Sequence, residues 1–134
     1  MRSCTNYIYL IEMAGLRIGH FGDIGQEAFT SDQLDVLGDI DIAITQFDNR
    51  YSQMTVQNMK GFVLMEQINP KLIIPTHTSR EASEQLSKKW ASIFTEQPSA
   101  TIAGSTLPGT TSILFMGTLA GSYGTLFDIP KSVW

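Results

Sequence analysis

The chain has 134 residues, of which 43% are hydrophobic and only 16% charged, below the roughly 25% charged residues of average soluble domains. Nine basic and thirteen acidic residues give a net charge of −4 without a long basic run, which disfavours nucleic-acid binding. No apolar stretch approaches the ~20 residues of a membrane span, no signal-peptide pattern opens the chain, and the lone Cys4 closes no intramolecular disulfide, so we expect a cytoplasmic protein.

The beginning of the chain predicts a β-hairpin followed by a sharp loop. Residues 7–13 form a dense β-branched and aromatic run, a two-residue turn signal follows, and residues 16–20 alternate up to His20. The next loop, residues 21–27, carries Asp23 between two glycines, which we expect to take positive φ values. Asp23 therefore lies in a loop of tight geometry, directly after a strand.

The middle of the chain predicts helices alternating with strands. Thr30 is a candidate N-cap and Gln33 its capping-box partner for a short helix that ends near Gly38. Residues 39–45 indicate a buried strand with its three isoleucines on one face. Apolar residues then recur at helical spacing over residues 56–68.

The start of that second helix is ambiguous, because Ser52 and Thr55 are both possible N-caps. Within it, Gly61 costs about 1 kcal/mol relative to Ala and so indicates a point of close packing. Residues 72–74 are short and fully apolar, as in a central strand with prolines confined to its ends.

After this strand, Thr78 with Glu81 forms a capping-box pattern for a third helix, whose apolar positions continue to Ile93. The loop-rich part, residues 96–134, follows the motif-bearing part, residues 6–95, and we expect a single domain over residues 1–134. Within the loop-rich part, strands are indicated at residues 112–116 and, more weakly, at residues 100–103. The apolar side chains of residues 121–134 are expected to dock on this domain or on another chain.

Asp23 and His77 are the candidate metal ligands, since each follows a predicted strand. Loops at the carboxyl ends of strands in an open α/β sheet converge, so we expect the two side chains at the same edge. His77 also precedes a helix, whose N-terminus disfavours the imidazolium and keeps the ring available to a metal. From the residues alone, a turn-forming Asp and a structural His are the alternative interpretation.

Residues 15–23, which end in His20-Phe-Gly-Asp23, and residues 70–77, Pro-Lys-Leu-Ile-Ile-Pro-Thr-His77, resemble the metallo-β-lactamase superfamily, specifically the ascorbate-6-phosphate lactonase-like branch. The likeness extends over residues 6–78. It implies an α/β fold, half of an αββα sandwich, with a mixed sheet and helices on one face. It also implies metal-dependent hydrolysis of an ester, lactone or phosphoester.

The same resemblance implies roles for four residues. Asp23 would be the catalytic carboxylate that bridges two divalent ions, zinc or manganese, and His77 a terminal ligand. His20 would contact the metal-binding side chains without binding the metal itself, and Arg50 would hold an anionic group of the substrate. A strand-end His and a plain surface Arg are the alternatives for these last two residues.

One part of the family pattern is missing: the motif H-x-H-x-D-H, which supplies most of the metal ligands, does not occur, and His20 and His77 are the only histidines. We therefore expect the equivalent of the C-terminal half of the fold, incomplete as a catalyst alone and able to remain metal-free. The low charge density suggests a covered surface. We expect the partner to be either a complementing N-terminal half chain or a second copy in a homodimer. Two rival hypotheses are a truncated, non-catalytic scaffold domain and an unrelated α/β binding domain.

Overall fold

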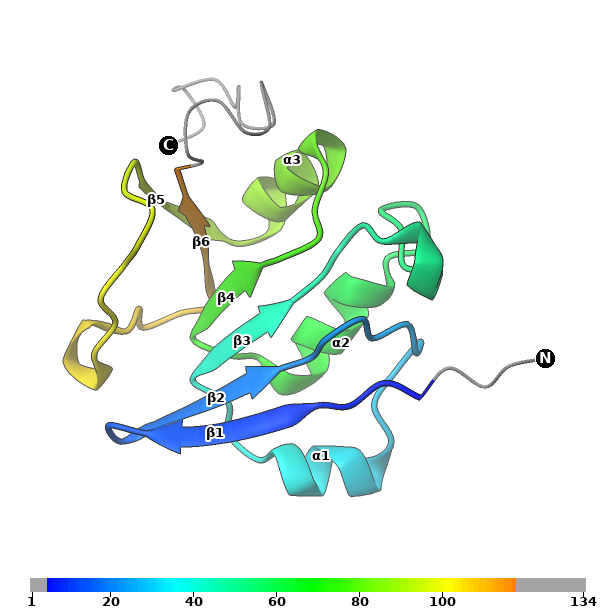
Figure 1. The fold of residues 1–134 in the computed structure, drawn as a ribbon, viewed down its shortest axis with the longest axis horizontal. Helices are drawn as coiled ribbons and strands as arrows, with labels where there is room; N and C mark the ends of the chain where they lie inside the picture. The colour runs from blue at the N-terminus through cyan, green and yellow to red at the C-terminus, as the bar shows by residue number, and fades with distance from the viewer. Residues whose placement is uncertain (1–4, 118–134) are drawn as a thin grey trace.

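The computed structural model describes residues 5–117, which form one mixed sheet covered by helices (Figure 1). The strand order is β1-β2-β3-β4-β6-β5; β1 runs antiparallel to β2, and all other neighbours are parallel. The strands are β1 (Tyr9–Met13), β2 (Leu16–His20), β3 (Ile42–Thr45), β4 (Leu72–Pro75), β5 (Ala91–Thr95) and β6 (Ser112–Met116). This confirms the predicted mixed α/β sheet and its N-terminal hairpin.

The helices of residues 5–117 are α1 (Ser31–Leu37), α2 (Lys60–Ile68) and α3 (Arg80–Lys89), with two short 3-10 turns, η1 (Arg50–Ser52) and η2 (Gly104–Thr106). Side chains from all three helices enter one apolar cluster with the strands, so the helices cover the same face of the sheet, as predicted. In the part of the chain that the structure describes, we find no helix of the length and apolarity needed to cross a membrane.

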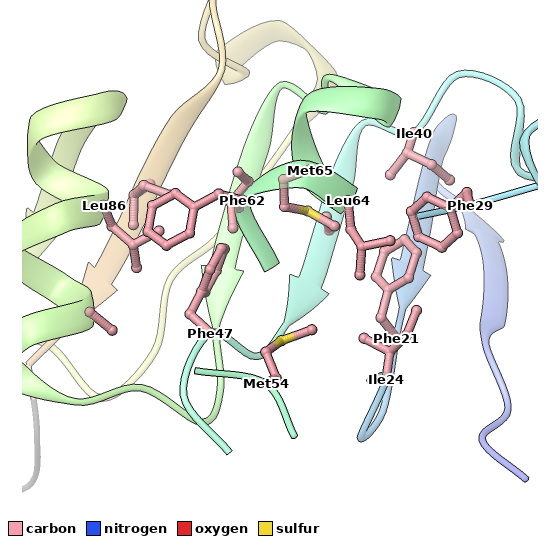
Figure 2. Packing of buried hydrophobic residues seen from close by; sticks show 14 of the residues in the cluster. Phe21, Ile24, Phe29, Ile40, Phe47, Met54, Phe62, Leu64, Met65 and Leu86 are labelled. Atoms are coloured by element: carbon pink, nitrogen blue, oxygen red, sulfur yellow. The ribbon is translucent and has the colours of Figure 1, made fainter. Parts of the chain in front are cut away.

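Apolar side chains such as Phe47, Phe62 and Met65 fill the core between the helices and the sheet (Figure 2). The packing is tightest at Gly61. A Cβ there would lie 2.8 Å from the Phe47 ring and 2.9 Å from the carbonyl oxygen of Gln46. Phe47 packs against Phe62 at 5.4 Å between ring centroids, and Trp90 stacks on Phe62 at 5.8 Å. The close packing expected at Gly61 is confirmed, because α2 can approach the loop after β3 only where a side chain is lacking.

None of the described α-helices packs on the opposite face of the sheet, and we call it the open sheet face. Four buried side chains on it form a second cluster, onto which Ile102 and Leu107 pack from the loop before β6. The β1 side is less covered: Tyr9, Ile11 and Met13 are exposed on this same face, across from β2. The buried members of the cluster are Leu16, Ile42, Leu72 and Leu114.

At the edge of the sheet where β3 begins, Asp41 joins three strands. Its carboxylate accepts hydrogen bonds from the backbone N–H of Arg17 at 2.9 Å and from Nζ of Lys71 at 3.1 Å. The Arg17 hydrogen bond, followed by the Lys71 hydrogen bond and charge, lowers the pKa of Asp41 against the opposing effect of burial. Asp41 is therefore a structural tie, not a member of the site described below.

The first predicted helix is confirmed in detail. Thr30 is the N-cap of α1, its side chain and that of Gln33 form the capping box, and Gly38 ends the helix. The predicted N-caps of the other two helices are wrong. α2 starts after Met59 in a left-handed conformation, because Thr55 and Asn58 bond each other's backbone one turn earlier. Ser79, not Thr78, caps α3.

The structure corrects two further expectations and confirms part of a third. Ile93 lies in β5 and not in a helix, because residues 91–95 pair in full register with β6. Ile40 precedes β3 and packs on the helix side, unlike Ile42 and Ile44. Residues 100–103 form no strand, whereas 112–116 form β6 as predicted. The docking predicted for residues 121–134 lies outside the described residues.

Candidate functional site

The loops that follow β2, β3 and β4 meet at one edge of the sheet, where these parallel strands end (Figure 1). Asp23 lies in the loop after β2, and His77 lies in the connection between β4 and α3. The two residues expected at a common edge are found there, which follows from the parallel direction of their strands.

The side chains of Asp23 and His77 approach each other from opposite loops. Oδ1 of Asp23 lies 3.7 Å from Nε2 of His77, with 70% and 61% of the two side chains exposed. Two ligands of a tetrahedral zinc ion with bonds near 2.0–2.1 Å lie about 3.3 Å apart, so only a small rotation separates this pair from that geometry. Both donors are of the type that binds zinc or manganese.

The described residues supply only this pair of donors. No group of three or more His, Cys, Asp or Glu side chains able to hold a metal ion occurs between residues 5 and 117. A catalytic zinc site usually has three protein ligands, so the pair fits part of a metal centre and not the whole of it.

The backbone around Asp23 is held by Asn6, which sequence reasoning did not single out. Oδ1 of Asn6 accepts the N–H of Asp23 at 3.0 Å, while Nδ2 of Asn6 donates to the carbonyl of Phe21 at 2.9 Å. Gly22, which precedes Asp23, has the expected positive φ of 57°. Gly25 does not have a positive φ; a glycine is required there because a Cβ would overlap the carbonyl oxygen of Ser52.

The carboxylate of Asp23 is held by the loop after β3. The amide of Asn49 donates to Oδ1 of Asp23 at 3.2 Å and to Oε1 of Gln46 at 2.7 Å. Gln46 is fully buried and donates in turn to the carbonyl of Ile24 at 2.8 Å and to Oγ of Ser52 at 2.6 Å. The sequence signal for Gln46 is a polar residue directly after a buried strand, but the sequence does not show which groups that residue bonds.

His77 is positioned through its backbone. Its carbonyl accepts the N–H of Phe47 at 2.8 Å and the N–H of Asp48 at 3.0 Å. These two hydrogen bonds join the loop after β4 to the loop after β3, which also holds Asp23. The three loops therefore form one hydrogen-bonded unit beneath the pair.

The other two candidate residues lie at the end of β2 and in the loop after β3. His20 is half-buried at the end of β2, and its Nδ1 accepts the N–H of Gly22 at 3.2 Å, so it supports the loop of Asp23 through the backbone. Arg50 is exposed at the start of η1. The proposed roles of these residues, and those of Asp23 and His77 as ligands, stay predictions.

Comparison with known proteins identifies the family. A sequence model described as a β-lactamase superfamily domain matches residues 1–77 of the 134, which include Asp23 and end at His77. The chain belongs to this family. The ascorbate-6-phosphate lactonase-like branch and the equivalence with a C-terminal half stay predictions within the superfamily.

The fold agrees with this assignment to the superfamily. A Thermotoga maritima protein assigned as a zinc-dependent hydrolase of the metallo-β-lactamase superfamily has a similar structure, with a TM-score of 0.56 and 18% sequence identity. The similarity covers 81% of this chain and 57% of that one, so the chain spans little more than half of its relative. No curated protein shows a significant match. The predicted metallo-β-lactamase fold is confirmed.

Proposed function

We propose that this superfamily domain contributes Asp23 and His77 to a divalent metal centre, zinc or manganese, for the hydrolysis of an ester, lactone or phosphoester. The observation that carries the proposal is the 3.7 Å approach of the carboxylate and the imidazole at the carboxyl ends of parallel strands. The hydrolase assignment of the Thermotoga maritima relative supports the reaction class.

The metal, when bound, would supply a water of pKa near 7 as the nucleophile and polarise the group under attack. The residues of this chain hold and orient the two ligand side chains, Asp23 and His77. The amide of Asn49 donates to Oδ1 of Asp23 and so orients the carboxylate, whose oxygens keep lone pairs that could hold an ion. The backbone bonds to His77 hold its imidazole at the same edge, within reach of the same ion.

The remaining ligands must come from outside the described residues, and we propose that a partner brings them. The partner is a second copy of the chain, or a complementing chain, that packs on the open sheet face. The exposed Tyr9, Ile11 and Met13 on that face support a contact there. A cytoplasmic setting is part of the same proposal.

Thermal unfolding with and without zinc tests the metal site. Zinc at a hundredfold excess over its dissociation constant should stabilise the wild type by about 2.7 kcal/mol, and Asp23→Ala and His77→Ala should lose this response. The control variant Asp39→Ala removes an exposed carboxylate outside the site and should keep the zinc response. An equal zinc response in wild type and His77→Ala would contradict the site and favour a scaffold domain.

The isolated chain should also show negligible hydrolysis of generic esters and phosphodiesters with added zinc or manganese, because two protein ligands are too few. Clear metal-dependent turnover that Asp23→Ala abolishes would show instead that the chain is a complete catalyst.

A further inference from the structure

We propose that the cavity beside Asp23 binds an uncharged, hydroxyl-rich ligand of about the size of a sugar ring or a disaccharide. The cavity has a volume of about 690 Å³ and lies between the loop after β2, the turn η1, the start of α1 and the residues that lead into β1. This volume falls within the roughly 300–1,000 Å³ of small-molecule sites. The inference rests on the proposed function, because it assigns the part of the substrate that does not react.

The polar lining of the cavity consists of uncharged groups with one exception. Amides and hydroxyls line it, Asp23 carries the only charge, and no Lys or Arg is among the described residues that form its wall. The carboxylate of Asp23 repels an anionic group placed beside it, although solvent weakens this repulsion because the side chain is exposed. A bound metal ion would offset this repulsion only for the reacting group that the ion itself binds. The polar uncharged residues of the wall are Thr5, Asn6, Gln26, Gln33, Tyr51, Ser52 and Gln53.

Two of these amides hold each other in place. Nε2 of Gln26 donates to Oε1 of Gln33 at 2.7 Å, and Nε2 of Gln33 donates back to Oε1 of Gln26 at 3.3 Å. Oε1 of Gln33 also accepts the N–H of Thr30 in the capping box of α1. Counting the contacts of the described residues, one N–H of Gln33 and one lone pair on Oε1 of Gln26 remain for a ligand. Fixed amides lower the entropy lost on binding hydroxyl groups.

Tyr51 provides the apolar surface that such a ligand needs. Its exposed fraction is 102%, so the ring makes no packing contribution to the fold, although its turn is well anchored. Oδ1 of Asn49 accepts the N–H of Tyr51 at 3.1 Å, and Gln53 closes the turn in a left-handed conformation with a φ of 54°. The electron-rich face of an aromatic ring attracts the C–H groups of a sugar ring packed against it.

Titration of the full chain with cellobiose and with methyl β-glucoside, in the presence of EDTA, tests the cavity without the metal. Amide NMR signals of residues 23–26 and 51–53 should shift, and Tyr51→Ala should weaken binding by about tenfold, equivalent to 1.4 kcal/mol. Tyr7→Ala removes an exposed tyrosine that does not line this cavity and should leave the affinity unchanged. Glucose 6-phosphate and inorganic phosphate should bind more weakly than the uncharged sugars.

Three outcomes would overturn the inference: no binding of the uncharged sugars at tens of millimolar, tighter binding of the phosphorylated sugar, or full affinity in Tyr51→Ala. Because EDTA removes metal ions, these outcomes are separate from the zinc response of His77. Sugar binding without a zinc response would leave the cavity assignment intact and reject the metal site; the reverse pattern would reject the cavity assignment alone.

Discussion

The side-chain amide of Asn49 and the carboxylate of Asp23 form a hydrogen bond of 3.2 Å between residues 26 positions apart in the sequence. It joins the loop after β2 to the loop after β3 at the edge where His77 also lies. Asn49 is buried, so this bond is shielded from water more than the exposed carboxylate would suggest. The geometry of Asp23 thus depends on a residue from another loop.

Replacing Asn49 with Ala should lower the free energy of unfolding by about 1–3 kcal/mol, because buried Gln46 loses its partner. The same change should weaken any zinc response that depends on Asp23. Chemical denaturation measures the first effect and thermal melts with zinc the second. Gln57→Ala removes an exposed amide and should change stability by less than about 0.5 kcal/mol. Equal effects of the two substitutions would mean that the Asn49 network does not hold the site.

Gly61→Ala should destabilise the fold although Ala has the higher helix propensity. The propensity gain is about 1 kcal/mol, whereas the added Cβ would press on the backbone oxygen of Gln46 and should cost about 1–3 kcal/mol through overpacking. Gly109→Ala places its Cβ in open space and is the matched control. Urea unfolding of both variants measures this difference. A Gly61→Ala protein as stable as wild type would show that α2 can move away from the loop after β3.

Asp41→Asn should remove a pH-dependent part of the stability. The folded state lowers the pKa of Asp41, so its contribution is present above the ordinary aspartate pKa and is lost as the pH falls through the lower folded pKa. Because the side chain is partly exposed, we expect about 1 kcal/mol at neutral pH. Denaturation from pH 7 to pH 2 should show the wild-type and variant curves converging at low pH. A constant difference at every pH would contradict this assignment.

Self-association should depend on the β1 side of the open sheet face. Ile11→Glu places a charge among the exposed Tyr9 and Met13, so it should shift the chain toward a monomer in light scattering. Val36→Glu adds the same charge at an exposed position on α1, on the other side of the sheet, and should leave self-association unchanged. A wild-type species of 14.8 kDa at micromolar concentration would contradict self-association through this face.

Much of the fold was predictable from signals between neighbouring residues. The hairpin up to His20 and the capping box of Thr30 with Gln33 depend on contacts a few residues apart, which the sequence displays directly. The common edge of Asp23 and His77 was also predictable, since parallel strands present their following loops on one side. Local physics was sufficient for these features.

Other features were decided only when distant segments came together. Ile93 became part of a strand because β6, a later segment of the chain, offered it a pairing partner. The roles of Asn6 and Asn49 could not be predicted, since an amide side chain bonds with whichever loop the fold brings within 3 Å or so. The sequence by itself therefore determined which residues could act as metal ligands and on which edge they lie. The tertiary structure alone decided what holds them there, because hydrogen bonds between separate loops have no local sequence signal.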